Sequence, residues 1–195
     1  MPDNPVIDFM RRRRSVLAAK MTAPGPGTAD LETMLEIGLR VPDHGKIEPW
    51  RVQILRAEGQ RRLGELYAAI VARDPDCRGA QIDAARERLQ RSPLLLVVSS
   101  HPDQKRVEKI PLIEQRLSAG AVCTNLLIAA TALGYAAQWL TGGPAYEPEI
   151  REALGHGADT VIAGFIHIGS VAEPPPERPR PDRDRIVSEW PNADA

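Results

Sequence analysis

The chain has little of what marks several classes of protein. Two of its 195 residues are cysteine, and aromatic residues make up 4%. Cys77 lies in a polar loop and Cys123 in an apolar run, so the two indicate neither a disulfide framework nor a metal site. The arginines at 11–14 are not followed by a compact apolar segment and a cleavage site, which argues against a signal peptide. We therefore expect a cytoplasmic protein without a bound metal.

Net charge is nearly absent as well. Lys and Arg together number 25 and Asp and Glu 26, which leaves a net charge of −1. Such a balance, with so few aromatic rings to stack on bases, argues against a nucleic-acid partner, although the arginines at 11–14 on a helix are the one feature that favours it.

The stretch 118–140 is long enough to resemble a membrane span. Polar residues such as Thr124, Asn125 and Gln138 interrupt it, so we expect no membrane and a helix buried by its own domain and a second subunit.

The order of predicted elements favours an α+β fold in a single domain. Apolar periodicity predicts helices at 5–14, 28–40, 59–72, 82–89, 114–133 and 148–154, and strands at 50–55, 93–99, 136–140 and 161–168. Helices and strands do not alternate strictly, and the long helix separates strands that lie far apart in the sequence. A proline-rich segment, 170–195, follows and predicts an extended C-terminal arm, so that the single domain spans 1–195.

Three motifs could build a binding site. L-R-V-P-D-H-G-K-I-E-P-W at 39–50 is a helix end followed by a polar loop and a strand, and it presents Arg40 and His44. R-R-R-R-S at 11–15 is a basic run that ends in a hydroxyl, and Q-W-L-T-G-G at 138–143 is a strand followed by bare backbone. No G-x-G-x-x-G follows a strand and no Walker loop is present, so dinucleotide-binding and P-loop folds are disfavoured.

These motifs, in this order, resemble the compact single-domain NAD(P)H nitroreductase branch of the FMN-dependent nitroreductase family. The resemblance runs from Phe9 to Gly169 and includes A-G-F-I-H-I-G at 163–169. It implies a central, mostly antiparallel sheet flanked by helices. It also implies a homodimer with the long helix in its interface, one FMN at each interfacial site, and an arm that wraps the partner subunit.

The resemblance assigns Arg13, Arg14 and Ser15 to FMN, whose phosphate needs concentrated donors. The simpler interpretation of these residues is a solvated basic helix end. Arg40 and His44 match flavin contacts near the N1 and O2 edge. Alternatively, Arg40 caps its helix, and His44 bonds local backbone or donates a proton to the substrate, since an unperturbed histidine has a pKa of about 6.5.

Thr141 and Gly142 match the family segment that approaches the flavin or its phosphate after the tryptophan strand. Related compact members often have an arginine where this chain has Leu140, so one expected phosphate contact is missing.

Three further residues have simpler expected roles. Glu48 replaces the usual glutamine before Pro-Trp, and we expect it to point away from the flavin or to pair with Lys46 or Arg51. Trp50 is expected to anchor its strand in the core. His167 is expected to be a hydrogen-bonded core histidine.

The resemblance implies an FMN-dependent NAD(P)H oxidoreductase. Hydride would pass through flavin N5 to a nitroaromatic, quinone or related small-molecule electron acceptor by a ping-pong mechanism, and no protein acid or base is required. The sequence shows no separate pocket for a 2′-phosphate, so NADH and NADPH both remain open as reductants. The alternatives are a flavin-dependent dehydrogenase of a bound metabolite and a flavin-binding protein without nicotinamide turnover.

Overall fold

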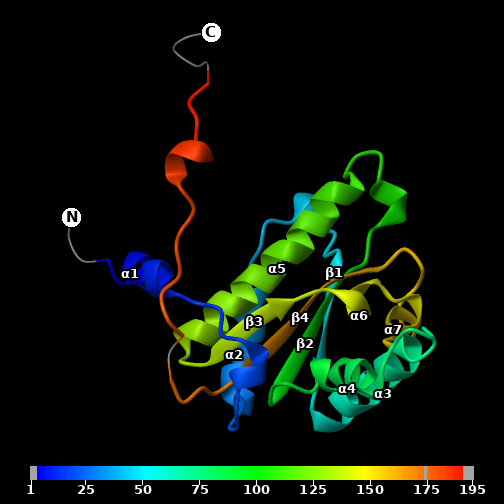
Figure 1. Ribbon diagram of the computed structural model, residues 1–195. Coiled ribbons are helices and arrows are strands. Elements are labelled where there is room, and N and C mark those ends of the chain that lie inside the picture. The colour runs from blue at the N-terminus through cyan, green and yellow to red at the C-terminus, as the bar shows by residue number, and fades with distance from the viewer. Residues whose placement is uncertain (1–3, 174, 191–195) are drawn as a thin grey trace.

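A four-stranded antiparallel sheet forms the centre of the computed structural model, which describes residues 4–173 and 175–190 (Figure 1). The strands lie in the order β1-β2-β4-β3, and each neighbouring pair is antiparallel. Their bounds are β1 Trp50–Leu55, β2 Leu94–Ser100, β3 Ala136–Leu140 and β4 Val161–Gly169. The predicted α+β fold with an antiparallel sheet is therefore confirmed.

Helices cover both faces of this sheet. Helices α2 and α5 pack on one face, whereas α3, α6 and α7 pack on the other, with α4 against α3. The helices are α1 Pro5–Arg12, α2 Thr28–Gly38, α3 Ala57–Val71, α4 Gly79–Arg88, α5 Leu112–Ala132, α6 Gly143–Tyr146 and α7 Pro148–Ala153. Single 3-10 turns occupy Ala18–Lys20, His44–Lys46, Gln104–Arg106 and Arg183–Arg185. Within the described part of the chain, no helix has the length and apolar character needed to span a membrane.

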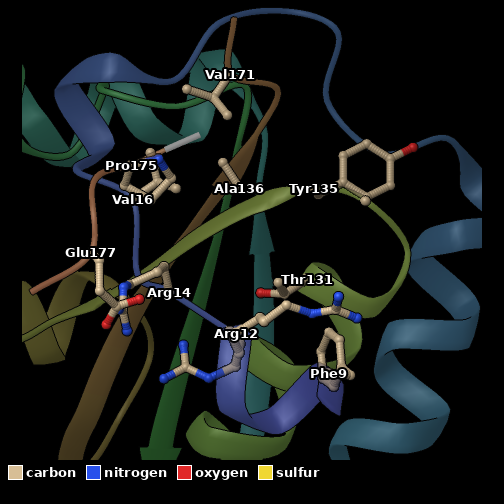
Figure 2. A pocket seen from close by; sticks show the side chains of 12 residues that line it. Phe9, Arg12, Arg14, Val16, Thr131, Tyr135, Ala136, Val171, Pro175 and Glu177 are labelled. Atoms are coloured by element: carbon tan, nitrogen blue, oxygen red, sulfur yellow. The ribbon is translucent and has the colours of Figure 1, made fainter. Parts of the chain in front are cut away.

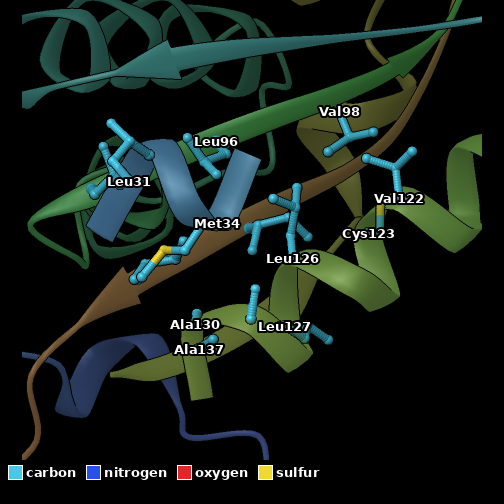
Figure 3. Close-up of a cluster of buried hydrophobic side chains, with 14 residues drawn as sticks. Leu31, Met34, Leu96, Val98, Val122, Cys123, Leu126, Leu127, Ala130 and Ala137 are labelled. Atoms are coloured by element: carbon cyan, nitrogen blue, oxygen red, sulfur yellow. The ribbon is translucent and has the colours of Figure 1, made fainter. Parts of the chain in front are cut away.

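Strand β2 divides its side chains between two cores. Leu94, Leu96 and Val98 point into the core beneath α2 and α5 (Figure 3), whereas Leu95 and Val97 point to the opposite core. All five are buried because helices cover both faces of the strand. A continuous apolar run is what such a doubly covered strand requires, which explains why the sequence predicted it.

The predicted boundaries differ from the observed ones mainly at the functional motifs. Helix α2 ends at Gly38 rather than Arg40, because the chain tightens there and the Arg40 amide donates to the carbonyl of Ile37. The short helix α6 was not predicted. It follows Gly142, whose φ of +78° no apolar pattern signals.

Helix α1 and the C-terminal arm extend away from the body of the molecule (Figure 1). The arm leaves the sheet through a bridge between Ser170 and Thr22, and Arg180 donates to the carbonyl of Arg11 at 3.3 Å. Ile186 and Trp190 on the arm are strongly exposed, at 68% and 91%. The predicted arm, 170–195, is extended over most of its described part, while residues 174 and 191–195 of it lie outside the described residues.

Candidate functional site

A cavity of about 350 Å³ lies where the C-terminal end of α5 meets the residues after α1 and the start of the arm (Figure 2). Arg13, Arg14, Thr131, Tyr135 and Glu177 are among the residues that line it. The structure therefore brings two of the predicted phosphate ligands into one cavity. We call it the arginine cavity.

The two arginines are short of hydrogen-bond partners. Nη1 of Arg13, and Nε and Nη1 of Arg14, are buried and form no hydrogen bond with any described residue. Arg14 also forms an ion pair with the Glu177 carboxylate (Figure 2). Buried donors without acceptors are unfavourable, and guanidinium groups bind oxyanions strongly. The arginine cavity is thus chemically suited to an anionic group such as a phosphate.

The backbone explains why these arginines point inward. Helix α1 ends at Arg12, and Arg13 adopts extended angles with φ −54° and ψ 133°. The chain then follows the edge of β3, where the Val16 amide donates to Ala137 at 3.1 Å and the Ala18 amide to the Gln138 side chain at 2.6 Å. In the segment between the end of α1 and the Val16 anchor, Arg14 lines the cavity and Ser15 is exposed.

Tyr135 contributes an aromatic ring to the cavity but not its hydroxyl. The hydroxyl donates to Asp30 of α2 at 2.6 Å, and this bond raises the pKa of Tyr135 above its ordinary value. The ring is therefore held in place by a partner outside the cavity.

A second cavity of about 500 Å³ adjoins the first and is lined by Ser15 and Lys20. Both cavities share Val16, Val171 and Pro175. Lys20 was missed by sequence reasoning. It lies at the end of the 3-10 turn Ala18–Lys20, and so short a turn leaves no periodic signal in the sequence.

The loop after α2 winds around Asp43. The Asp43 carboxylate accepts from the amides of Ile47 at 3.3 Å and Glu48 at 2.9 Å. Gly45, Lys46 and Glu48 adopt φ values of +70°, +52° and +49° in the left-handed region. Because Asp43 holds this tight loop, His44 is exposed at its rim.

His44 is held by the first turn of α5 rather than by local backbone. Its Nδ1 lies 2.7 Å from Oε2 of Glu114, and both side chains are about half exposed. The predicted alternative of a local backbone bond is therefore wrong. A carboxylate at Nδ1 leaves Nε2 available to a ligand.

Arg40 is exposed and its side chain forms no ion pair with any described residue. Its carbonyl accepts from the Asn125 side chain of α5 at 2.9 Å. Since α2 ends at Gly38, with Leu39 at the C-cap position, Arg40 does not cap the helix. The guanidinium group is free for another partner.

Among the described residues Glu48 does not pair with Lys46 or Arg51, so this alternative is wrong, and the other one, that Glu48 points away from the flavin, stays a prediction. Arg51 donates to the Glu48 carbonyl at 3.0 Å and not to its carboxylate. Trp50 is half-buried against the core, and its Nε1 donates to Ser118 of α5 at 3.0 Å, so its predicted anchoring role is confirmed. The prediction that His167 is a hydrogen-bonded core histidine is also confirmed, because its side chain is buried and its Nδ1 lies 2.9 Å from the Ser92 hydroxyl.

Thr141 and Gly142 lie directly after β3. Gly142 has a φ of +78°, and a Cβ atom there would lie 2.4 Å from Nη2 of Arg88. Leu140 is partly buried against an apolar cluster around Val16. Arg88, which sequence reasoning missed, therefore brings a cation from α4 to the segment whose expected arginine is absent.

One chain does not bring all the predicted ligands together. Arg14 lies at the C-terminal end of α5, beside Thr131, whereas His44 lies at its N-terminal end, beside Glu114. Seventeen residues of helix at 1.5 Å each separate these places by about 26 Å. Ile113 and Leu117, on the same helix, are 61% and 66% exposed. The predicted site is therefore split between the two ends of α5, and exposed apolar side chains lie near the His44 end.

The structure is an α+β protein with an antiparallel sheet beneath a long central helix, and guanidinium N–H groups without hydrogen-bond partners lie in a cavity at the end of that helix. Comparison with known families is more specific, because the model of the Nitroreductase family matches residues 10–170. The chain belongs to the nitroreductase family, a family of oxidoreductases. The predicted family and its oxidoreductase class are thereby confirmed.

Individual relatives agree with this assignment. The chain is 31% identical over 166 residues to an Escherichia coli protein described as "Putative NAD(P)H nitroreductase YdjA", covering 84% of this chain and 87% of the relative. A nitroreductase-like protein from Bacillus cereus has the same fold with a TM-score of 0.81 at 21% identity, covering 98% and 99% of the two chains. A Bacteroides fragilis nitroreductase with bound FMN aligns with a TM-score of 0.70 at 22% identity, covering 96% and 99%.

Proposed function

We propose that this protein is an FMN-dependent NAD(P)H oxidoreductase that reduces nitroaromatics, quinones or related electrophiles in a ping-pong reaction. The observation that carries the proposal is the set of buried, unpartnered N–H groups of Arg13 and Arg14. The Bacteroides fragilis nitroreductase with bound FMN and the relatives named NAD(P)H nitroreductases support the choice of cofactor and reductant.

The residues present fit an FMN phosphate. Arg13 and Arg14 offer guanidinium donors from the arginine cavity, and Ser15 offers a hydroxyl beside it. Lys20 adds an ammonium group in the adjoining cavity. When bound, FMN supplies a two-electron carrier that accepts hydride at N5, so the chain itself needs no nucleophile.

We further propose that two copies complete each site. A two-fold axis through the middle of α5 would bring the arginine end of one helix beside the His44 end of the partner's helix. The same arrangement would bury Ile113 and Leu117, which are exposed in one chain. The C-terminal arm, with its exposed apolar Ile186 and Trp190, would then wrap the partner subunit.

In the completed site, Arg40 would hold a positive charge near the flavin, where a cation favours the reduced form. His44, held through Nδ1 by Glu114, presents Nε2 to the acceptor and is the candidate proton donor. Thr141 and Gly142 bring a hydroxyl and bare backbone close to the flavin or its phosphate. Both cysteines are free thiols, which is compatible with the cytoplasmic location that we propose.

The test is anaerobic reduction of the FMN-loaded protein by NADPH or NADH, followed by addition of a nitroaromatic or quinone. We expect either reductant to bleach the flavin absorbance near 450 nm, roughly where FMN absorbs, and the acceptor to restore it. A flavin that no nicotinamide bleaches would contradict the proposal and favour a metabolite dehydrogenase or a passive flavin-binding protein.

A further inference from the structure

A basic pocket of about 410 Å³ lies beside His44. We use "basic pocket" for the space lined by His44, Gly45, Lys105, Arg106, Glu108 and Lys109. It joins the loop after α2 to the segment between β2 and α5. The phosphate ligands of the proposed flavin site are not part of it.

Lysine is concentrated at this pocket. The chain has four lysines, at 20, 46, 105 and 109. Lys105 and Lys109 line the pocket, and Lys46 follows its lining residue Gly45. Neither Lys105 nor Lys109 lies within ion-pair distance of a carboxylate among the described residues. The pocket therefore holds more positive charge than its one lining carboxylate, Glu108, neutralises.

One hydrogen bond joins the two walls of the pocket, and an ion pair within one wall orients its donor. Arg106 donates to the Gly45 carbonyl at 3.4 Å and lies 3.4 Å from the Asp103 carboxylate. Gly45 also allows a close approach, because a Cβ atom there would lie 2.9 Å from Cδ1 of Ile110. Arg106 is thus engaged in structure, and the lysines are left to bind a ligand.

The lysine-bearing segment is tied to α5 by a buried glutamine. Gln115 is 1% exposed, accepts from the Asp103 amide at 2.7 Å and donates to the Ile110 carbonyl at 2.9 Å. These two bonds hold both ends of the segment that carries Lys105 and Lys109. Because the backbone is already fixed, less conformational entropy is lost when an anion binds.

We propose that the basic pocket binds the 2′-phosphate of NADPH and makes this protein select NADPH over NADH. The inference rests on the proposed function, since it takes His44 to lie at the flavin. His44 lines the pocket, so a dinucleotide at the flavin can extend directly towards Lys105 and Lys109. Lysine ammonium groups are effective point charges for a phosphate dianion. This pocket could not be predicted from the sequence, because its two walls are about sixty residues apart in the chain.

The test measures calorimetric binding of adenosine 2′,5′-bisphosphate and of AMP to the FMN-loaded protein. AMP has the same base and 5′-phosphate but lacks the 2′-phosphate. We expect the bisphosphate to bind more tightly by about tenfold, the size of one charge-assisted contact. The double variant Lys105→Ala/Lys109→Ala should lose this difference and should keep its affinity for AMP.

Reduction kinetics give a second readout. In the double variant, kcat/KM for NADPH should fall by about tenfold and that for NADH should stay within about twofold. The control is the double variant Arg56→Ala/Arg62→Ala. It removes the same charge from two exposed residues, one just before α3 and one on it, and it should retain the preference for NADPH.

Three results would overturn the inference. They are equal affinity of the wild type for the two nucleotides, an unchanged NADPH preference in the lysine variant, and loss of FMN from that variant. Failure of the proposed function is distinguishable, because then neither nicotinamide bleaches the flavin, whereas the binding comparison still reports on the basic pocket.

Discussion

At the scale of single residues, the account depends on donors that the folded chain leaves unpaired. Arg13 and Arg14 are buried far enough for their N–H groups to lose water, yet the described residues provide few acceptors. Such an arrangement is unfavourable in an empty protein and becomes favourable when an oxyanion is bound. Ligand binding and stability are therefore coupled at these two side chains.

Arg13→Ala should weaken FMN binding. Loss of a charged hydrogen-bond donor costs about 1.5–3 kcal/mol, which corresponds to roughly a 10- to 150-fold higher Kd. Fluorescence titration of FMN measures this directly. Arg62→Ala, an exposed arginine on α3, is the control and should leave Kd unchanged. An unaltered Kd in Arg13→Ala would remove this residue from the phosphate site.

His167 makes stability depend on pH. It is 1% exposed and lies 2.9 Å from the Ser92 hydroxyl, and burial lowers its pKa from 6.5 to about 4. The unfolded chain therefore takes up a proton between pH 6.5 and 4 that the folded chain does not. The contribution of His167 to the free energy of unfolding should fall by about 3 kcal/mol as the pH drops through this window.

Urea unfolding at several pH values between 7.5 and 4 tests this dependence. In His167→Gln the part of the slope that His167 contributes should disappear, because glutamine does not titrate. If wild type and variant lose stability in parallel, the proton taken up on unfolding belongs to other groups.

At the scale of elements, most of the fold could be predicted from apolar periodicity. Strand β3 has its predicted bounds, and the predicted helix 114–133 is observed as Leu112–Ala132. The failures occur where backbone angles or tertiary contacts decide the structure. Helix α6 starts after a glycine of positive φ, and α2 ends at Gly38 rather than at the predicted Arg40.

The residues of the candidate site also differ in whether the sequence could predict that they lie together. Arg13, Arg14 and Ser15 form a local run, so the sequence could indicate them as one group. Lys20, Arg88 and the lysines of the basic pocket reach their neighbours through loops and packing, which no spacing in the sequence encodes. The partner of His44 was likewise hidden, since Glu114 lies 70 residues further along the chain.

Helices α3 and α4 pack so closely that glycine is required at their contact. A Cβ atom at Gly64 would lie 2.4 Å from the backbone carbonyl oxygen of Arg86, which cannot rotate away. Gly64→Ala should therefore destabilise the protein by about 1–3 kcal/mol, as overpacking does. Gly79→Ala, also helical but with open space around it, is the control and should be neutral or slightly stabilising.

Chemical denaturation of both glycine variants provides the comparison. Equal stability of Gly64→Ala and the wild type would show that α3 and α4 can separate without cost.

At the scale of the whole molecule, the separation between the arginine cavity and His44 is the central fact. About 26 Å of helix lies between them, so one chain cannot place both at the same FMN. The exposed Ile113 and Leu117 lie on the same helix and suggest the surface that joins two copies.

Leu117→Glu should separate the two copies. A carboxylate would be buried in the proposed interface, which is strongly unfavourable, while the 66% exposed side chain leaves the fold of one chain unaffected. We expect a folded monomer by light scattering and loss of bound flavin. Ala84→Glu adds the same charge to an exposed position of α4 and should remain an FMN-bound dimer. A dimeric, yellow Leu117→Glu protein would exclude this surface.

Native mass spectrometry of the FMN-reconstituted wild-type protein tests the central claim most directly. The account predicts one dominant species of two chains with two FMN molecules, because two-fold symmetry creates two equivalent sites. A single chain that retains FMN, or a flavin-free protein in any assembly, would contradict it.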